Sequence, residues 1–391
     1  MSKTEIVVVG AGIAGLTSAA ILSKLGLSVT LIESHTQSGG CAGTFKRKRY
    51  IFDVGATQVA GLEEGGIHSK IFKFLDIPLP EASILNPACI VDLKDGSKPI
   101  PIWYDKDEWI KEREMQFPGS RQFWLVCNLI HQSNWTFANN NPVLPVKNFW
   151  DFSQLLKALV PTNLVTGILI KSTIFDLLRF CGLSNDERLI KFLNLQLKLY
   201  SQEDVYNTAA LYGSTVLQMC QKPHGLWHLK KSMQALSDAL EDSLKKRGVN
   251  IVFGQKVNSI NFDYVKKSWK VCASSKLENM VYFADDVIYT PPPQSLLKHL
   301  KSPLDNTYNY KKRIQSLPDP SGALVFYSAL KKEHIKVISS NHYQFVSNEL
   351  GSLFVSISEE GDGRAPKGEI TLIASLFTKT NDWFSLDKHD Y

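Results

Sequence analysis

The sequence feature that most constrains the fold is an apolar stretch near the start, EIVVVGAGIAGLTSAAILSKLGLSVTLIES at residues 5–34. Such a stretch could be an export signal, a membrane anchor or the first elements of a fold. A signal peptide has a basic beginning, one apolar block and a small-residue cleavage site. Here Gly10, Gly12 and Gly15 divide the block and Lys24 interrupts it, so no uncharged run reaches the roughly 20 residues of a membrane-spanning helix. The stretch is therefore expected to begin a fold, without a signal peptide.

The divided stretch predicts a β-α-β unit. Residues 6–9 are a β-branched run typical of a strand buried on both faces of a parallel sheet. The turn Gly10–Gly15 has the pattern GxGxxG and opens a helix rich in Ala and Leu that should end near Gly26. A second strand, residues 29–32, leads to Glu33, which lies 18 residues beyond the last glycine of the turn. A GxGxxG turn between a strand and a helix, with an acid at this spacing, predicts dinucleotide binding.

Each glycine of the turn has a physical role in dinucleotide binding. Gly10 permits the tight turn, Gly12 lets the backbone approach a pyrophosphate, and Gly15 lets the helix pack closely on the strand. The helix N-terminus offers unpaired N–H groups and a positive dipole end to the phosphates. Glu33 would accept hydrogen bonds from an adenosine ribose and repel a 2′-phosphate, which disfavours an NADP-type ligand. An ordinary buried β-α-β unit is the alternative. The predicted cofactor contacts of this unit are Gly10, Gly12, Ile13, Ala14, Gly15 and Glu33.

Length and composition are those of an ordinary globular chain. The 391 residues predict two domains, or one large domain with insertions. A hydrophobic share of 44% and a charged share of 21% are typical of a soluble protein. Six cysteines without a C-x-x-C pair indicate free thiols in a reducing compartment. The oligomeric state does not follow from the sequence.

The charge pattern excludes one class of partner. The net charge is +6, and the one dense basic run, residues 46–49, is interpreted as a solvated loop or as a contact with anionic lipid. The sequence has no basic helix, no zinc-finger spacing and no repeat of aromatic and basic residues. No nucleic-acid partner is therefore expected.

The segment after Glu33 separates FAD from NAD as the predicted cofactor. In an NAD enzyme the second strand normally continues into another βα unit. Here it enters a loop that contains Gly39, Gly40 and Gly43, followed by FDVGAT at residues 52–57. Such a loop could lay further backbone N–H groups along a longer, buried cofactor. Turn formation alone would also explain these glycines, but the whole arrangement favours FAD.

The GxGxxG turn, the acid, the GG-x-x-G loop and FDVGAT together resemble the flavin-containing amine oxidase and phytoene desaturase superfamily. Residues 223–260 resemble the second cofactor-binding stretch of that superfamily: a helix, a glycine-led strand and a valine, here Val257, whose backbone meets the adenine. Residues 284–293 resemble the strand that closes this part of the sheet. The resemblance also implies that residues 55–57 border the flavin ring. The FAD contacts that it adds are Gly39, Gly40, Cys41, Gly55, Ala56, Thr57 and Val257.

Within this superfamily the sequence is most similar to carotenoid enzymes, above all to cyanobacterial-type carotenoid C-3′,4′ desaturases. The likeness is carried by GGCAGTF, FDVGATQVAGLEEGG, QFPGS with the following FW, and EEGDGRAPKGEITLIASLFTKTNDWF. Carotene cis-trans isomerases share the flavin motifs but match these stretches less well. Family members continue to a glycine-rich segment that holds part of the flavin, whereas this sequence stops at DWFSLDKHDY. We therefore expect a truncated product, a fragment or a half that needs a partner.

The expected fold class is α/β, with an α+β second domain. A Rossmann-like FAD-binding domain with a three-layer parallel sheet would be formed by residues 1–90 and 221–300. Residues 91–220 would form a helical, partly membrane-facing substrate-binding region, in which Pro118–Gly119 separates two helices. Residues 301–391 would add an antiparallel sheet to the substrate domain.

The most apolar part of the helical region is residues 149–180. Its longest uncharged run, residues 158–170, is too short to span a bilayer, and Pro161 would interrupt a helix. The segment could be a buried pair of core helices or an element that lies in the membrane interface. Flanking basic residues such as Lys157 and Lys171 suit an interface, and a carotenoid must be drawn from lipid. The chain is therefore expected to be peripheral, on the cytoplasmic side of a membrane.

No metal site and no catalytic residue is predicted. His224 and His228 are four residues apart, but the glutamate of H-E-x-x-H and a third ligand are missing. This stretch is interpreted as a turn into a helix. Glu63, Glu64 or His68 could supply a weak base, although ordinary loop residues are the alternative.

The predicted function is FAD-dependent carotenoid desaturation. The flavin would accept a hydride from an allylic CH2 of the polyene, and the conjugated chain would delocalise the positive charge. The protein would then need only to orient the chain, exclude water and offer a weak base. The first alternative is a carotenoid cis-trans isomerase that uses reduced FAD. The second is an inactive or truncated carotenoid-binding paralogue.

Overall fold

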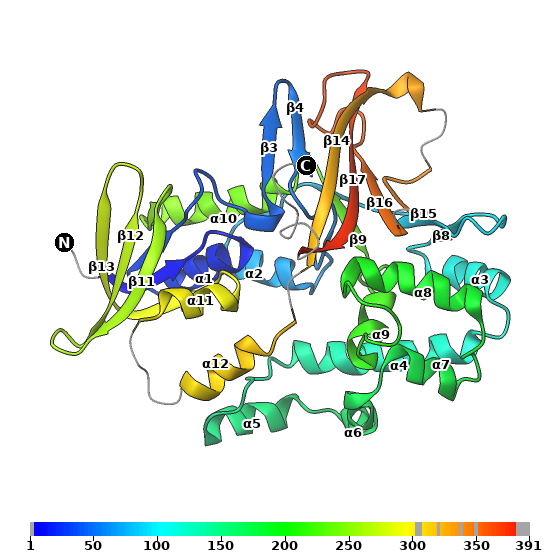
Figure 1. Cartoon of the computed structure of the whole chain (residues 1–391), viewed down its shortest axis with the longest axis horizontal. Coiled ribbons are helices and arrows are strands. Elements are labelled where there is room, and N and C mark those ends of the chain that lie inside the picture. Colours follow the sequence, from blue (N-terminus) through cyan, green and yellow to red (C-terminus); the bar gives the residue numbers. More distant parts are fainter. Residues whose placement is uncertain (1–3, 302–306, 319–320, 336–338, 348–350, 381–391) are drawn as a thin grey trace.

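The computed structural model describes residues 4–301, 307–318, 321–335, 339–347 and 351–380. Two six-stranded sheets organise these residues, and a group of helices lies below the second sheet in Figure 1. The C-terminal stretch DWFSLDKHDY, on which the expectation of a shortened chain depends, lies outside the described residues.

The first sheet combines strands that are far apart in the sequence. Its order is β10 (Asn250–Val252), β2 (Val29–Ile32), β1 (Thr4–Val9), β13 (Asn279–Tyr289), β12 (Ser268–Ser274) and β11 (Lys256–Asp263). β10, β2, β1 and β13 are parallel to one another. β13, β12 and β11 then form an antiparallel meander. The sheet is therefore parallel only in part, because short turns join antiparallel strands whereas parallel strands need a long crossover.

Three layers surround β1, as expected for a Rossmann-like unit. The helices of this part are α1 (Ile13–Lys24), α10 (Gln234–Lys246) and α11 (Pro293–His299). Val8 faces α1 and α10, where it shares a buried cluster with Leu16 and Leu240. Val7 and Val9 point the other way, into a cluster with the meander and α11. Successive side chains of a strand point to opposite faces, so the β-branched run of β1 is buried on both sides.

The second sheet has the order β14 (Ser321–Lys331), β17 (Glu369–Lys379), β16 (Gly351–Ile357), β15 (His342–Ser347), β7 (Cys89–Asp92) and β8 (Ile100–Ile102). It is antiparallel, as expected, except that β15 and β7 are parallel. These two strands are distant in sequence, and no local turn sets their direction. β7 begins before the expected boundary at residue 90, and the domain boundaries themselves stay a prediction.

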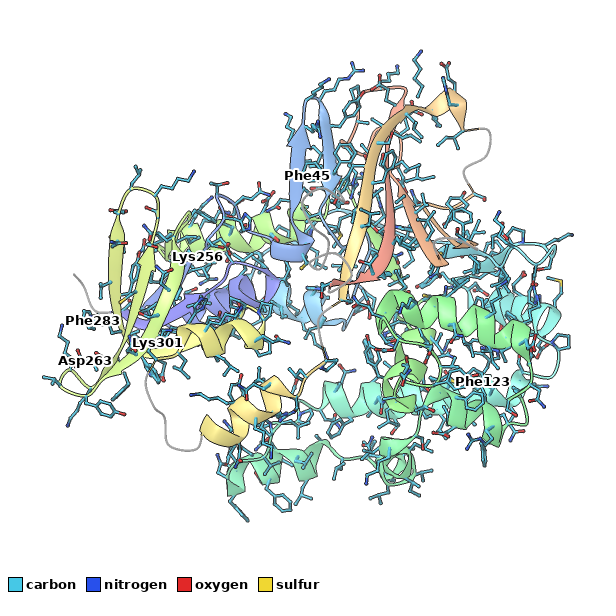
Figure 2. The ribbon with its side chains drawn as sticks, in the orientation of Figure 1. Phe45, Phe123, Lys256, Asp263, Phe283 and Lys301 are labelled. Atoms are coloured by element: carbon cyan, nitrogen blue, oxygen red, sulfur yellow. The ribbon has the colours of Figure 1, made fainter. Side chains whose placement is uncertain are left out.

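Several smaller elements accompany the two sheets. A hairpin of β3 (Thr44–Arg47) and β4 (Tyr50–Asp53) exposes the basic run at its tip, and Phe45 of this hairpin (Figure 2) meets Tyr327 of β14 edge to face, with ring centroids 4.9 Å apart. The three-stranded sheet is β5 (Val59–Ala60), β9 (Leu226–Leu229) and β6 (Ala82–Ile84). The remaining short helices are α2 (Ile67–Leu75), α12 (Thr307–Gln315), η1 (Gly40–Ala42) and η3 (Lys332–His334).

The helical region confirms both predicted breaks. Its elements are α3 (Lys106–Gln116), α4 (Arg121–Asn139), α5 (Phe149–Ala158), α6 (Pro161–Gly167), η2 (Ile168–Lys171), α7 (Ile174–Phe180), α8 (Glu187–Tyr200) and α9 (Ala210–Gln218). The chain leaves the helix at Pro118–Gly119, and Pro161 is the first residue of α6. Phe117, Phe123 (Figure 2) and Trp124 fill the centre of this region.

α5, α6 and η2 lie along the lower edge of the molecule in Figure 1. Within the described residues, no single helix is long and apolar enough to cross a bilayer. Phe149–Ala158 and Pro161–Lys171 together have the required length and composition, but the chain bends by 98° between them. Many apolar side chains of residues 149–171 are exposed, so the alternative of a buried pair of core helices is wrong for this part. Ile174, Leu177 and Leu178 of α7, in the same apolar stretch, do lie in the core.

Candidate functional site

The glycine turn between β1 and α1 is as tight as its sequence requires. Gly10 has φ +96°, and a Cβ atom there would lie 2.7 Å from the hydroxyl of Thr290. A Cβ atom at Gly15 would overlap the carbonyl oxygen of Gly10. Both positions therefore need glycine for the fold itself.

Gly12 is different, because a Cβ atom at this position would meet nothing within 4 Å. Gly12 is the N-cap residue of α1, and neither a side-chain cap nor an acidic residue in the first turn neutralises the helix end. The N–H groups of the first turn, from Ile13 to Gly15, and the positive end of the dipole are thus available to an anion. Open space beside an uncapped helix N-terminus suits a phosphate.

The carboxylate of Glu33 lies against this turn. Its Oε2 accepts a hydrogen bond from the N–H of Ala11 at 2.6 Å, and its Oε1 accepts one from the N–H of His35 at 2.8 Å. The side chain is buried at the end of β2. Each carboxylate oxygen can accept a further hydrogen bond, so binding of a ribose by Glu33 stays a prediction.

The second glycine-rich loop lies directly on the first. The N–H of Gly39 donates to the carbonyl of Ala11 at 2.8 Å, and a Cβ atom at Gly40 would lie 3.2 Å from Cα of Gly12. Gly39 and Gly40 have φ +118° and +55°. The loop therefore depends on backbone conformations that favour glycine.

The segment FDVGAT continues this row of contacts. The N–H of Ala56 donates to the carbonyl of Cys41 at 3.2 Å, and a Cβ atom at Gly55 would lie 3.0 Å from the same carbonyl oxygen. Cys41 is exposed, as are Gly55 and Ala56, whereas Thr57 is buried. Exposed backbone at residues 55–56 leaves room for a ligand above this segment.

Val257 lies at the opposite end of the row, near Glu33. The N–H of Gln255 donates to the carbonyl of Glu33 at 3.0 Å, and Val257 follows at the start of β11. The register of β11 with β12 shifts between Val257 and Ser259. The structure thus joins the segments that carry the predicted cofactor residues through direct contacts, although contact with a cofactor stays a prediction.

An apolar cavity of about 390 Å³ opens beside Gly55–Gln58. Its other walls come from the helical region and from the second sheet, and none of its lining residues is charged. The lining residues are Val54, Gly55, Ala56, Thr57, Gln58, Ala60, Leu199, Tyr200, Met219, Leu226, Ala323, Val325, Phe354, Ser356, Ile373, Ser375 and Phe377.

His342 of β15 lies behind the wall of the apolar cavity and is fully buried. Its Nε2 is 3.3 Å from Oγ1 of Thr57 and 3.2 Å from Oγ of Ser356. Its ring stacks on Phe354 with centroids 5.6 Å apart. Burial, together with the charges of His228 and Arg364, lowers the pKa of His342 to about 3, so the ring is neutral at ordinary pH.

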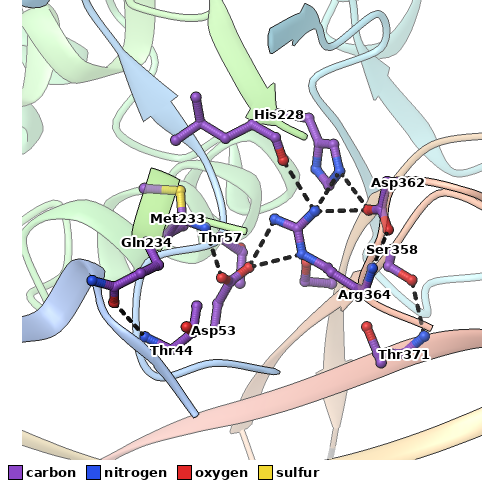
Figure 3. A network of polar contacts seen from close by, with 12 residues as sticks. Thr44, Asp53, Thr57, His228, Met233, Gln234, Ser358, Asp362, Arg364 and Thr371 are labelled. Atoms are coloured by element: carbon purple, nitrogen blue, oxygen red, sulfur yellow. Dashed lines mark hydrogen bonds and ion pairs between the residues drawn. The ribbon is translucent and has the colours of Figure 1, made fainter. Parts of the chain in front are cut away.

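A buried polar network fixes the start of FDVGAT (Figure 3). Arg364, in the turn between β16 and β17, bonds Oδ2 of Asp53 at 3.1 Å and Oδ2 of Asp362 at 2.7 Å. Asp53 also accepts from the N–H of Met233 at 2.8 Å, and Asp362 is 3.0 Å from Nε2 of His228. Burial works to raise the pKa of Asp362, but His228 and Arg364 outweigh it and hold the pKa below its usual value. The network ties the second sheet to the segment beside the apolar cavity.

Comparison with known proteins supports the Rossmann-like unit that contains the glycine turn. Residues 8–76 match the model of the NAD(P)-binding Rossmann-like domain. The chain is 23% identical to all-trans-retinol 13,14-reductase of Rattus norvegicus, over 97% of this chain and 63% of that protein. It is 24% identical to 4,4′-diapolycopene oxygenase of a Methylomonas species, over 93% of this chain and 73% of that protein. It is 22% identical to the chloroplastic prolycopene isomerase of Arabidopsis thaliana, over 100% of this chain and 66% of that protein.

Two solved structures share the fold. A protein of Pyrococcus furiosus matches with a TM-score of 0.68 and 17% identity, over 96% of this chain and 80% of that chain. A double mutant of putrescine oxidase matches with a TM-score of 0.64 and 14% identity, over 99% of this chain and 79% of that chain. The α/β fold class with a Rossmann-like domain is confirmed.

The three residues considered as a base lie away from the apolar cavity. Glu63 and Glu64 line a separate, polar cavity of about 530 Å³, and His68 lies in α2 and lines neither cavity. Oε1 of Glu63 is 3.0 Å from Nδ1 of His224. Burial works to raise the pKa of Glu63, but bonding to His224 and to the backbone keeps that pKa below its usual value. Burial lowers the pKa of His68.

The HGLWH stretch is not a turn into a helix. His224 precedes β9, His228 lies within β9, and the next helix, α10, begins only at Gln234. Pairing of β9 with β5 and β6 overrides the helical interpretation. Among the described residues, no group of three His, Cys, Asp or Glu side chains could hold a metal ion. All six cysteines are free thiols.

Sequence reasoning missed His342, Ser356 and Arg364. Thr57 and His342 are 285 positions apart, and no local pattern indicates that they meet. Residues 361–364 form a turn between β16 and β17, and Asp362 and Arg364 of this turn are buried. An arginine in a glycine-rich turn is usually exposed, so no pattern in the sequence signals its burial.

Proposed function

We propose that this chain is an FAD-dependent carotenoid desaturase. The observation that carries the proposal is the open space at Gly12, beside an uncapped helix end, which a chain of contacts through Gly40 and Cys41 connects to an apolar cavity at residues 55–58. A long cofactor with a pyrophosphate in its middle and a flat ring at one end would follow these contacts. The backbone of residues 12–15 and 39–41 would hold its phosphates, Glu33 its ribose and residues 55–57 its ring.

FAD, when bound, supplies an acceptor for hydride next to the cavity. The chain's own contribution is then to position an apolar substrate and to exclude water. A polyene cation is stabilised by its own conjugation, so no strongly charged group is needed beside it. The uncharged lining of the cavity supports this assignment. The names of three similar proteins, which refer to retinol, 4,4′-diapolycopene and prolycopene, support a polyene substrate.

Carotenoid isomerisation with reduced FAD is the second candidate. Similarity to prolycopene isomerase favours it, and the same cavity would serve both reactions. The test is expression of the chain in carotenoid-producing cells, followed by mass analysis of the pigments. A desaturase removes two hydrogen atoms for each new double bond and shifts the absorption to longer wavelength, whereas an isomerase conserves mass. Unchanged pigments, together with protein that lacks flavin, would contradict both and favour a carotenoid-binding protein without activity.

We further propose that α5, α6 and η2 dock on the cytoplasmic side of a membrane, from which the substrate enters. Apolar side chains are exposed here to an unusual degree: Phe149 is 85% exposed, Trp150 62% and Ile168 81%. Exposed Lys157 and Lys171 flank them. Aromatic, aliphatic and basic side chains in this combination suit the boundary between lipid headgroups and acyl chains.

A further inference from the structure

The wall of the apolar cavity carries a few polar side chains, and two of them share one partner. Thr57 and Ser356 both line the cavity, and their hydroxyl groups lie 3.3 Å and 3.2 Å from the same atom, Nε2 of His342. Thr57 belongs to the segment after β4, whereas Ser356 and His342 belong to adjacent strands of the second sheet. Residues from two distant parts of the chain thus converge on one nitrogen.

Other hydroxyl groups of the cavity already have partners within the protein. The hydroxyl of Ser375 donates to the carbonyl of Phe354 at 3.5 Å, and the hydroxyl of Tyr200 is 3.7 Å from Sγ of Cys220. Within the described residues, the hydroxyl groups of Thr57 and Ser356 contact only the His342 ring. Both side chains line the cavity, so their remaining hydrogen-bonding capacity is open to a ligand there.

The bonding around His342 determines which hydrogen atoms remain free. The ring is neutral and carries one N–H, although the backbone of Thr57 works to raise its pKa. Nδ1 is buried, and no acceptor lies in hydrogen-bond geometry to it. We assign the proton to Nε2. An N–H at Nδ1 would be buried without an acceptor, whereas two hydroxyl oxygens lie beside Nε2 and can accept from an N–H there. The Nε2–H then donates to the oxygens of Thr57 and Ser356, and the hydrogens of these hydroxyl groups point away from the ring.

We propose that Thr57 and Ser356, oriented by His342, form a hydrogen-bond-donor site for an oxygen atom of the substrate, so that the substrate is a polyene alcohol, aldehyde or ketone and not a pure hydrocarbon. This assignment rests on the proposed polyene chemistry and narrows its substrate class. Two O–H donors without an acceptor are costly to bury in an apolar cavity, and a ligand oxygen would satisfy them. His342 is a positioning residue, since it acts through the two hydroxyl groups.

The experiment is a binding titration with two polyenes of equal length, one a hydrocarbon and the other its terminal alcohol or aldehyde. Binding is followed by the absorption of the polyene itself, so the measurement does not require bound flavin. The wild-type protein should bind the oxygen-bearing polyene about tenfold more tightly, as expected for one or two neutral hydrogen bonds. The double variant Thr57→Val with Ser356→Ala should bind both ligands with the same affinity.

Three further variants separate positioning from folding. Ser375→Ala removes a hydroxyl of the same cavity that has its own partner, and it should keep the preference. His342→Phe preserves the stack on Phe354 and should lose the preference. Ser356→Thr retains a hydroxyl at this position and should keep the preference for the oxygen-bearing polyene. Equal binding of both polyenes by the wild type, or an equal loss in Ser375→Ala, would overturn the proposal.

Failure of the donor site and failure of the proposed desaturase function give different results. A protein that binds no FAD but prefers the oxygen-bearing polyene would contradict the desaturase and support the donor site. A double variant that weakens FAD binding while keeping the polyene preference would show that the two hydroxyl groups serve the flavin, and the substrate assignment would be wrong.

Discussion

At the scale of single residues, Gly12 separates ligand binding from folding. We expect Gly12→Val to lower the affinity for FAD by about a hundredfold, roughly 2.8 kcal/mol, because the side chain fills the space through which a pyrophosphate approaches. The fold should tolerate the change, since a Cβ atom meets nothing within 4 Å. FAD content after purification and the midpoint of thermal unfolding measure the two effects.

Gly167→Val is the matched control for Gly12→Val. A Cβ atom at Gly167 also meets nothing within 4 Å, and this residue lies in α6, far in sequence from the glycine turn. The control should retain FAD. Gly15→Val, in contrast, should fail to fold because the carbonyl of Gly10 occupies the required space. Full FAD content in Gly12→Val would contradict the assignment of the cleft.

His342 should make stability depend on pH. Its folded pKa of about 3 lies below the value of about 6.5 in an unfolded chain. Between these two values the unfolded chain binds a proton that the folded chain does not, so the free energy of unfolding falls as the pH is lowered. Between pH 7 and pH 5 the expected loss is about 2 kcal/mol, measured by urea unfolding.

His342→Phe is the control for the pH dependence. It should remove the part of the fall in the free energy of unfolding between pH 7 and pH 5 that is due to His342. His131, whose pKa burial lowers to about 4, adds a slope of the same sign that remains in the variant. An identical pH dependence in wild type and variant would mean that His342 is not buried in neutral form.

The residues of the site were only partly predictable. Gly10, Gly12 and Gly15 follow from a local pattern, because tight turns and close backbone contacts allow few residue types. His342 and Ser356 could not be foreseen, because their partner Thr57 is reached only through pairing between distant strands. Local geometry is encoded locally, whereas a polar cluster in a cavity wall depends on tertiary packing.

At the scale of elements, the pair α5–α6 can be tested as a membrane-binding face. Trp150→Glu with Ile168→Glu should abolish sedimentation with phosphatidylglycerol vesicles, because each buried apolar side chain contributes roughly 1.5–3 kcal/mol. Stability should hardly change, since both side chains are exposed. Leu277→Glu, at a position 96% exposed and distant in sequence, is the control and should still bind vesicles. Equal binding by all three proteins would contradict the proposal.

The elements themselves were well predicted where the pattern is strong. β1, α1 and β2 follow from β-branched runs and glycines, and the helical breaks follow from proline. β9 was missed, because its four residues become a strand only by pairing with β5 and β6. The parallel pairing of β15 with β7 likewise has no local signal.

At the scale of the whole molecule, Arg364 connects the second sheet to the segment beside the cavity. Arg364→Ala should lower the free energy of unfolding by about 3–5 kcal/mol, because Asp53 and Asp362 would remain buried without their cation. Arg49→Ala is the control: it removes an ion pair with Glu369 that also joins distant segments but lies at the surface. Its effect should be small. A similar loss in both variants would contradict a special role for the buried network.

We propose that the backbone of residues 12–15, 39–41 and 55–57, together with Glu33, holds FAD, and one titration tests this proposal directly. Purified protein is titrated with FAD while the visible flavin spectrum and the flavin fluorescence are recorded. We predict saturation at one FAD per chain, with a perturbed spectrum in the wild type and none in Gly12→Val. A wild-type protein that leaves the spectrum of excess FAD unchanged would contradict the claim.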